Sequence, residues 1–528
     1  MPTTAGLRPA TPHGCPIGAL GAALGTEAHT VAGSPADPAL VVLGVTLDSR
    51  AVGPGDVYAA LPGAHVHGAQ FAAQAQRDGA VAVLTDEAGL ERLRDDGCTL
   101  PAFVVPSPRA VLGDVAARVY GTVEGGSRLA LLGVTGTNGK TTTTYLLDSA
   151  LRAAGRTTAL IGTVETRVAG QRVPSVRTTP EAPEMHRLLA VMRERGVQVC
   201  SMEVSSQALA QHRVDGIVVD VAGFTSFSQD HLELHGDMAT YLAAKAMLFT
   251  PEHSRRAVVV VDDDGGRQIA QRATVPVETI SGTPDADADW VVVSRVHDRT
   301  GTDFVLRPRH AAGLSTGELE LRCPLPGDFN VMNTALAAVM LLRYGLSPRA
   351  VVRGLRHAGG VPGRMEQVGA AGGEAPLVVV DYAHTPDAIT AALGAVRPVV
   401  SGRLLVVLGA GGDRDPSKRA AMGAAAARAA DVVVVTDDNP RSEDPAAIRA
   451  VVLAGAREAA RTSSAEVVEI ADRGDAIRYA VDLAGAGDVL LVAGKGHEQG
   501  QEVGGEVHPF DDRDQVRTAL ARRTAAHS

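Results

Sequence analysis

The segment from Leu129 to Gly155 joins an apolar run, LALLGV, to a glycine-containing loop, TGTNGK, and then to TTTTYLLDSALRAAG. Apolar runs without polar alternation are typical of strands buried on both faces of a parallel sheet. The last run predicts a helix that ends at its glycine. A strand that turns through glycines into a helix directs backbone N–H groups and the positive helix N-terminus to one place. The segment therefore predicts an α/β domain with an anion site at a strand end.

The loop ends in Gly-Lys-Thr, as phosphate-binding loops do, but Val134 occupies the place of the usual first glycine. Gly136 and Gly139 allow backbone N–H groups to turn towards phosphate oxygens. Lys140 can bridge the β- and γ-phosphates, and Thr141 can bind Mg²⁺. The alternative is a tight strand-to-helix turn without a ligand. The position of Gly-Lys-Thr between an apolar strand and a helix favours nucleotide binding.

The chain has 528 residues, which is too long for one core and predicts about three domains. Residues 1–40 are rich in Pro, Ala, Gly and Thr and are expected to form a loosely ordered tail. We expect a small α/β domain at 41–125, a central domain at 126–360 and a third domain at 361–528. In the third domain, apolar runs end in polar loops: LLVVLGAGGDRD, VVVVTDDNPR and VLLVAGKGHE. Ligands bind at such carboxyl ends of parallel strands.

The formal charge of −10 argues against general affinity for nucleic acid or anionic membranes. Four scattered cysteines without a CxxC pair favour cytosolic thiols over a zinc site or disulfides. No apolar run of about 18 residues predicts a membrane span. We therefore expect a cytoplasmic protein, acting as a monomer on small-molecule substrates.

The form GTNGKT, preceded by Val134, resembles the loop of the Mur ligase family and of its folylpolyglutamate synthetase relatives. The resemblance runs from about Val41 to FDDRD near the end. It implies a small N-terminal α/β uridine-nucleotide-binding domain, a central parallel-sheet ATPase domain with the phosphate loop, and a C-terminal Rossmann-like α/β domain. It also implies ATP as co-substrate, with its phosphates held by Gly136, Thr137, Asn138, Gly139, Lys140, Thr141 and Thr142.

The segment FSQDHLELHG brings together four residues of types that bind metals, Asp230, His231, Glu233 and His235, although a solvated turn has the same composition. By resemblance to the family, Glu203 and His231 are the Mg²⁺-binding pair. Also by resemblance, Lys245 is carbamylated by CO₂ and binds a second Mg²⁺. The implied catalytic residues are Lys140, Glu203, His231 and Lys245, and the implied metal ligands are Thr141, Glu203, His231 and Lys245.

Further segments resemble the family's nucleotide-binding parts. Asn330 and Asn333, in PLPGDFNVMNTALAA, correspond to the turn and helix around the adenine, although Asn is also a preferred helix cap. Asp381 and His384, in DYAHTPDA, correspond to the segment that closes over the nucleotide. Arg364 is expected to meet the nucleotide at the hinge before the third domain.

Three segments resemble the family member that adds diaminopimelate to a UDP-N-acetylmuramoyl dipeptide. DSRAVGPGDVYAALPG resembles its uridine-binding domain, and Ser49 is expected near the uracil and diphosphate. The segments VRTTPEAP and SSQALAQHRV match its substrate-binding positions: Thr178, Thr179, Ser205, Gln211 and Arg213. An arginine can pair with an acidic group of that substrate, and hydroxyls can bind phosphate or carboxylate.

The third segment, DDNPRSEDP, contains the DNPR string of the diaminopimelate-adding enzymes. Diaminopimelate carries a carboxylate at its far end, which an arginine can bind with two hydrogen bonds and which lysine lacks. The implied diaminopimelate residues are Arg414, Asp438, Asn439, Pro440, Arg441, Gly494 and Glu498. Arg441 and Arg414 are assigned to carboxylates, and Gly494 and Glu498 to an ammonium group.

Four alternatives remain open from the sequence. Two are ligases on the same scaffold, a lysine-adding member and a folylpolyglutamate synthetase-like enzyme. The third is a phosphate-loop switch or motor ATPase, which would hydrolyse ATP without any amino acid. The fourth is a catalytically inactive binding protein, which the presence of Lys140, Thr141, Glu203 and Lys245 disfavours.

Overall fold

The computed structural model describes residues 7–63, 65–122, 129–175, 177–298, 300–310, 317–369 and 375–527. The predicted boundary at residues 125 and 126, and the first six residues of the predicted tail, lie outside the described residues. The chain forms two compact units. Unit 1 comprises residues 1–291, 308–316 and 335–354, and unit 2 comprises 292–307, 317–334 and 355–528.

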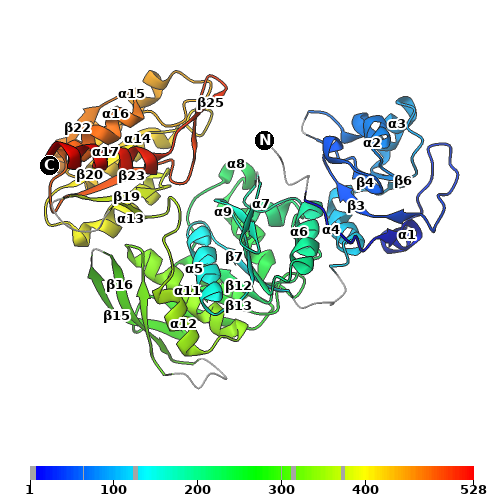
Figure 1. Cartoon of the computed structure of the whole chain (residues 1–528), viewed down its shortest axis with the longest axis horizontal. Coiled ribbons are helices and arrows are strands. Elements are labelled where there is room, and N and C mark those ends of the chain that lie inside the picture. Colours follow the sequence, from blue (N-terminus) through cyan, green and yellow to red (C-terminus); the bar gives the residue numbers. More distant parts are fainter. Residues whose placement is uncertain are drawn as a thin grey trace. The chain divides into compact units, whose positions relative to one another are not determined.

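The first part of unit 1 is a four-stranded parallel sheet in the order β3-β4-β5-β6 (Figure 1). Its strands are β3 (Gly44–Thr46), β4 (Asp56–Ala59), β5 (Ala82–Thr85) and β6 (Ala102–Val104), and its helices are α2 (Ala72–Arg77), α3 (Glu87–Asp95) and α4 (Pro108–Val119). All residues of β4 and β5 are buried. The predicted small α/β unit is thus confirmed.

The prediction of a loosely ordered tail is wrong for residues 7–40. The strand β1 (Cys15–Pro16) pairs with β2 (Val41–Val42), and the helix α1 (Ile17–Leu24) follows β1. Cys15, Ile17 and Leu20 lie in the same apolar core as β3 and β4. The composition was misleading because a short helix of Gly, Ala and Leu needs only a few buried apolar side chains to dock on an existing sheet.

The central sheet has the order β10-β9-β8-β11-β7-β12-β13-β14-β15-β16-β17. Its strands are β7 (Ala130–Thr135), β8 (Thr158–Ile161), β9 (Thr166–Val168), β10 (Gln171–Val173), β11 (Val199–Glu203), β12 (Val221–Phe224), β13 (Ala257–Val260), β14 (Val277–Ser281), β15 (Trp290–Asp298), β16 (Gly301–Pro308) and β17 (Leu319–Cys323). The strands from β8 to β14 in this order are parallel, as predicted from their apolar runs. The associated helices are α5 (Lys140–Ala153), α6 (Ala182–Glu194), α7 (Ser206–Ala210), α8 (Leu232–His235), α9 (Met238–Ala246), α10 (Asp264–Arg272), α11 (Asp328–Tyr344) and α12 (Pro348–Arg356).

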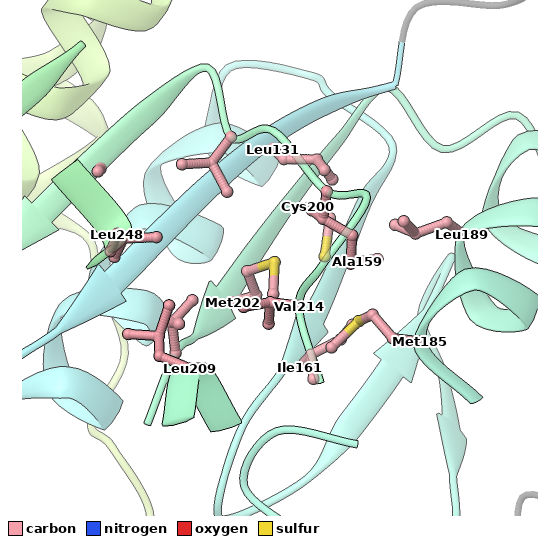
Figure 2. Close-up of a cluster of buried hydrophobic side chains, with 14 of the residues drawn as sticks. Leu131, Ala159, Ile161, Met185, Leu189, Cys200, Met202, Leu209, Val214 and Leu248 are labelled. Carbon is pink, nitrogen blue, oxygen red and sulfur yellow. The ribbon is translucent and has the colours of Figure 1, made fainter. Parts of the chain in front are cut away.

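The side chains of successive residues in these strands point to opposite faces of the sheet. Figure 2 shows one face, where Cys200 and Met202 of β11 and Ile161 of β8 lie with Met185 and Leu189 of α6. Helix α5 packs on β7, β8 and β11. Both faces of this part of the sheet are therefore covered, and the loop after β7 begins at a strand end.

The main sheet of unit 2 has the order β18-β19-β23-β20-β21-β22, in which only β18 is antiparallel. Its strands are β18 (Glu366–Val368), β19 (Leu377–Asp381), β20 (Leu404–Leu408), β21 (Val432–Val435), β22 (Glu466–Glu469) and β23 (Val489–Ala493), and a separate hairpin is formed by β24 (Gly500–Val503) and β25 (Glu506–Pro509). The helices are α13 (Pro386–Val396), α14 (Lys418–Ala429), α15 (Pro445–Ser463), α16 (Arg473–Leu483) and α17 (Asp512–His527). The predicted polar loops follow β20, β21 and β23 and share one sheet edge.

Among the described residues, no helix combines the length and the apolar character needed to cross a membrane. The four cysteines are buried free thiols.

Replacing Leu20, which is fully buried, with Ala should lower the free energy of unfolding of the N-terminal sheet by about 2–5 kcal/mol, because it removes buried methyl groups and leaves a cavity. Urea denaturation of the purified protein measures the change. The control is Ala23→Ser, on the exposed side of the same helix, which should change stability by less than about 0.5 kcal/mol. An unchanged Leu20→Ala variant would show that α1 does not contribute to this core.

Candidate active site

The loop after β7 has the geometry predicted for a phosphate-binding loop. Gly136 has φ 144° and Gly139 has φ 87°, both in the region that favours glycine, and α5 begins at the next residue, Lys140. A Cβ added at Gly136 would lie 1.9 Å from the Thr225 Oγ1. The N–H groups of the first turn of α5 have no intrahelical acceptors and carry the positive end of the helix dipole.

A segment after β12 supports the loop from one side. The Thr137 N–H donates to the Ser226 carbonyl (2.8 Å), and the Asn138 N–H donates to the Ser226 Oγ (3.4 Å). The Thr225 hydroxyl donates to the Asn138 carbonyl, and the Ser228 N–H donates to the Thr137 Oγ1 at 3.1 Å. These bonds hold the loop open without using its helix-side N–H groups.

Two lysines converge on the loop. The Lys140 Nζ donates to the carbonyls of Gly136 (2.9 Å) and Thr137 (2.8 Å), and the Lys245 Nζ donates to the same Gly136 carbonyl at 2.7 Å. Lys245 lies over the Tyr241 ring, 4.4 Å from its centroid. Burial, and then the charge of Lys140, lower the pKa of Lys245 well below its usual value. The sequence assigned Lys245 to the phosphate site only by resemblance to the family, whereas the structure shows its hydrogen bond to the Gly136 carbonyl of the loop.

Glu203 ends β11 opposite Val134 of β7, so its side chain lies beside the start of the loop. Its Oε1 accepts from the Thr163 N–H (2.8 Å) and its Oε2 from the Thr163 hydroxyl (3.0 Å). A Cβ on Gly162 would lie 2.4 Å from the Glu203 Oε1, so the neighbouring glycine makes room for the carboxylate. The Thr163 hydroxyl also lies 3.0 Å from the Thr178 hydroxyl.

The prediction that residues 230–235 gather as a metal cluster is not confirmed. Within the described ranges, no group of three or more His, Cys, Asp or Glu side chains is placed to hold a metal. His231, which has φ 53°, pairs with Asp230 (3.3 Å) and Glu233 (3.6 Å), whereas the His235 Nε2 lies 3.0 Å from the Ser206 Oγ. Asp230 and Glu233 thus flank His231, and the rings of His231 and His235 both lie against the Tyr241 ring, with centroid distances of 6.2 and 5.0 Å.

The residue types around the loop nevertheless fit Mg²⁺. The Thr141 hydroxyl is in the first turn of α5, and the Glu203 carboxylate ends the adjacent strand, so both oxygen types that Mg²⁺ prefers flank the phosphate loop. His231 follows the segment that supports the loop. The assignment of Thr141, Glu203, His231 and Lys245 as a metal set stays a prediction.

Five of the six predicted substrate residues belong to one hydrogen-bonded network: Thr178, Thr179, Ser205, Gln211 and Arg213. The Thr179 hydroxyl donates to the Glu203 carbonyl (2.9 Å) and accepts from the Ser205 N–H (3.1 Å), while the Ser205 Oγ caps α7 by accepting from the Ala208 N–H. The Arg213 Nη2 donates to the Gln211 Oε1 at 2.6 Å. The network also reaches the Thr163 and Thr178 hydroxyls through the Glu203 side chain.

Arg213 already has an acidic neighbour within the chain. Its Nε lies 3.1 Å from the Glu181 Oε1, and Arg109 and Arg177 lie 3.0 and 3.6 Å from the same carboxylate. Three guanidinium groups share one carboxylate, so this region keeps a positive excess that suits an acidic ligand. Ser49 begins a short 3₁₀ helix (Ser49–Ala51) in the N-terminal sheet domain, capped by the Asp48 side chain, and its predicted role remains a prediction.

In unit 2, the DNPR string lies beside GKGHE. The Asn439 Oδ1 accepts from the fully buried Lys495 Nζ (2.7 Å), and the Asn439 Nδ2 donates to the Glu498 Oε2 (2.8 Å). The same Oε2 accepts from Lys495 at 3.2 Å. A Cβ on Gly494 would lie 2.4 Å from the Asp438 Oδ2, so this glycine allows the two strand-end loops to approach. These contacts bring Asp438, Asn439, Gly494 and Glu498 together, and their assignment to diaminopimelate stays a prediction.

Arg441 lies in the same cluster in an unusual backbone conformation, with φ 52°. Its Nε donates to the Glu502 Oε2 (3.0 Å) and its Nη1 to the Gly412 carbonyl (2.7 Å). Arg414 lies two residues beyond Gly412 and is exposed. Its positive charge opposes the rise that burial causes in the pKa of Tyr382. Pro440 precedes Arg441 and accepts a hydrogen bond from the Glu443 N–H.

The predicted nucleotide residues of unit 2 form two groups. The Asn330 Nδ2 donates to the Pro326 carbonyl (2.8 Å) and its Oδ1 accepts from Asn333 (3.1 Å), so both amides stabilise the start of α11. Arg364 stacks on Tyr382, 4.5 Å from the ring centroid, and the His384 ring lies 4.6 Å from the same ring. Burial raises the pKa of Asp381, although Arg364 opposes this shift.

Residues 41–120 match the Mur ligase family catalytic domain, 134–341 the Mur ligase middle domain and 363–496 the Mur ligase glutamate ligase domain. The chain is 49% identical to the UDP-N-acetylmuramoyl-L-alanyl-D-glutamate--2,6-diaminopimelate ligase of Streptomyces coelicolor, over 98% of each chain. The chain belongs to the Mur ligase family.

Two further relatives agree. The enzyme of the same description from Corynebacterium glutamicum is 46% identical over 95% of each chain. A solved structure of a UDP-N-acetylmuramoyl-L-alanyl-D-glutamate--2,6-diaminopimelate ligase superposes with a TM-score of 0.67 and 32% identity, covering 92% of this chain and 96% of that chain. The predicted family and its three-domain α/β architecture are thus confirmed, whereas the individual domain boundaries stay predictions.

Sequence reasoning missed several residues that complete the Mur ligase site. Thr163 orients Glu203, Glu181 contacts Arg213, Lys495 holds the Asn439 amide and Glu502 contacts Arg441. Of these four residues, only Lys495 could have been found from the sequence, because it lies inside the GKGHE string. The other three are common surface residue types, and only the fold brings them to their partners.

Replacing Gly136 with Ala should weaken ATP binding at least about tenfold, because the new Cβ would meet the Thr225 hydroxyl that supports the loop and because φ is unfavourable. Isothermal titration calorimetry with ATP measures the change. Gly394→Ala in α13 is a matched control, since nothing lies within 4 Å of its added Cβ. Equal affinities of both variants would mean that the loop does not bind the phosphates.

Proposed function

We propose that this chain is an ATP-dependent amide ligase that adds 2,6-diaminopimelate to UDP-N-acetylmuramoyl-L-alanyl-D-glutamate in peptidoglycan precursor synthesis. The observation that carries the proposal is the cluster of Asn439, Arg441, Lys495 and Glu498 at one sheet edge of unit 2. It presents a guanidinium and a carboxylate, which are the partners of an amino-acid head group. Relatives named for this reaction match nearly the whole chain. We propose further that it acts in the cytoplasm as a monomer.

ATP binds, in this proposal, with its phosphates on the loop from Gly136 to Thr142. The helix-side N–H groups and the Lys140 ammonium take the phosphate oxygens. The Gly136 carbonyl holds the Lys140 ammonium, and Ser226 and Ser228 hold the preceding loop residues Thr137 and Asn138. Asn330, Asn333, Arg364, Asp381 and His384 are assigned to the nucleoside. Arg364 and Tyr382 stack on each other, so they offer a flat surface for a base or ribose.

Mg²⁺ would be held by Thr141, Glu203, His231 and a carbamylated Lys245, and it neutralises phosphate charge when bound. The Lys245 environment supports carbamylation, because CO₂ reacts with a neutral amine and burial lowers the pKa of this group. Carbamylation replaces a cation with an anion beside Lys140. The same buried position excludes water from the modified group.

The UDP-sugar dipeptide is assigned to Ser49, Thr178, Thr179, Ser205, Gln211 and Arg213. Its phosphate and carboxylate groups suit the positive excess around Glu181 and the hydroxyls of the network. Because Thr178 connects through Thr163 to Glu203, the substrate and phosphate sites share one hydrogen-bonded chain. The γ-phosphoryl group of ATP passes to the free D-glutamate carboxylate and forms an acyl phosphate.

Diaminopimelate is assigned to Arg414, Asp438, Asn439, Pro440, Arg441, Gly494 and Glu498. Arg441 binds the far carboxylate and Glu498 the ammonium beside it, which leaves the other amine to attack the acyl phosphate. The resulting tetrahedral intermediate collapses to the amide and inorganic phosphate. The Streptomyces coelicolor and Corynebacterium glutamicum relatives, which are 49% and 46% identical and named for 2,6-diaminopimelate, favour this amino acid over the lysine-adding and folylpolyglutamate alternatives.

Purified protein with ATP, Mg²⁺ and UDP-muramoyl dipeptide should release phosphate with diaminopimelate and much less with lysine, because lysine has no carboxylate for Arg441. Arg441→Lys should raise the KM for diaminopimelate about 10- to 100-fold, the loss expected when charged hydrogen bonds are removed. Coupled phosphate release with each amino acid omitted in turn is the assay. Arg457→Lys, an exposed arginine of α15, is the control. Phosphate release without any amino acid would favour the motor ATPase alternative.

Lys245→Ala should reduce turnover at least about a hundredfold, because it removes both the carbamate and the contact with Gly136. Short carboxylic acids such as acetate should restore part of the activity by supplying the missing carboxylate. Lys418→Ala, at the start of α14, provides the control. Wild-type activity in Lys245→Ala would refute the metal-binding role of this residue.

A further inference from the structure

The hairpin strand β24 runs along the DNPR string, and successive residues of the strand contact successive residues of the string. The Gln501 Nε2 donates to the Asp438 carbonyl (2.8 Å), and the Glu502 N–H donates to the Asn439 Oδ1 (3.0 Å). The Arg441 N–H donates to the Glu502 carbonyl (2.9 Å), and the Gly504 N–H donates to the Arg441 carbonyl (2.7 Å). The hairpin therefore fixes the backbone of the string from Asp438 to Arg441.

The Glu502 side chain adds a separate interaction. Its Oε2 accepts from the Arg441 Nε at 3.0 Å, while the Arg441 Nη1 donates to the Gly412 carbonyl at 2.7 Å. Two bonds to different atoms of a planar guanidinium fix the orientation of its plane. Both bonds leave Nη2 available to a ligand. The Arg441 side chain is 22% exposed, so the group is held while one edge stays accessible.

We infer that Glu502 is a positioning residue that holds the Arg441 guanidinium ready for the far carboxylate of diaminopimelate, and that it thereby contributes to selection against lysine. The inference rests on the proposed function. An unrestrained arginine loses side-chain freedom when it binds a ligand, and this loss weakens binding. Because Glu502 already restricts the Arg441 side chain in the free protein, less side-chain freedom is lost when the ligand binds. Since the pair is partly exposed, its main effect is on orientation and not on charge.

The backbone contacts separate positioning from folding. Glu502→Ala removes the carboxylate but keeps the Glu502 N–H and carbonyl that bind Asn439 and Arg441. The hairpin therefore stays docked in this variant. Glu502→Gln keeps an oxygen acceptor for the Arg441 Nε but removes the charge, so it tests whether the hydrogen bond or the charge matters. Glu506→Ala, an exposed carboxylate on β25, is the control.

The experiment measures kcat and KM for diaminopimelate, ATP and UDP-muramoyl dipeptide with the full-length chain. Glu502→Ala should raise the KM for diaminopimelate between about twofold and about tenfold, the range for one side chain that must be ordered on binding. The kcat and the other two KM values should change less than twofold, and the preference for diaminopimelate over lysine should fall by the same factor. Glu502→Gln and Glu506→Ala should behave as the wild type does.

Several results would overturn the inference. They are an unchanged KM in Glu502→Ala, an equal rise in the KM for ATP, or a failure of Glu502→Gln to restore the diaminopimelate KM. The thermal midpoint of each variant shows whether a loss reflects unfolding. If the wild-type protein does not ligate diaminopimelate at all, the proposed function fails and this inference fails with it. Wild-type ligation together with an unaffected Glu502→Ala variant overturns the inference alone.

Discussion

Two ammonium groups, those of Lys140 and Lys245, donate to the single carbonyl of Gly136. Two like charges this close repel each other, and burial makes the repulsion stronger than in water. Burial, and then the charge of Lys140, lower the pKa of Lys245, which favours its neutral form. A bound triphosphate or a carbamate would add negative charge beside the remaining cation. The charge imbalance at the loop therefore explains why a site of this kind suits ATP and modification of one lysine.

The remaining geometry of unit 1 extends from this loop through Glu203. Its side chain binds Thr163, its backbone carbonyl binds Thr179, and its strand lies next to the strand that enters the loop. A movement of the Glu203 carboxylate towards a cation would disturb Thr163 and then Thr178. In the proposed function, these hydrogen bonds would couple phosphate binding to acceptor binding, which suits an enzyme that transfers a phosphoryl group only when its acceptor is present.

The sequence was informative where local pattern determines structure. Apolar runs predicted β7, β11, β20, β21 and β23, because strands covered on both faces need continuous apolar residues. The order of these strands and the partners of their loops depend on tertiary packing. The docking of Ile17 and Leu20 on the first sheet has the same origin, which is why composition alone suggested a tail. Composition alone does not decide whether residues 230–235 bind a metal, because the same side chains also pair with one another and pack against Tyr241.

The charges of the diaminopimelate region differ from those of the loop. Arg441, Arg473 and Lys495 are accompanied by the carboxylates of Asp438, Glu498, Glu502 and Asp512 within one connected cluster. Positive and negative groups nearly balance there, whereas cations dominate at Gly136. A balanced cluster suits a ligand with equal numbers of ammonium and carboxylate groups, such as diaminopimelate. Lysine would bring a second ammonium without a second carboxylate, so its binding would leave the Arg441 Nη2 without that acceptor, while Glu502 keeps the Nε paired. In the proposed function, the orientation of Arg441 therefore contributes to the choice of amino acid.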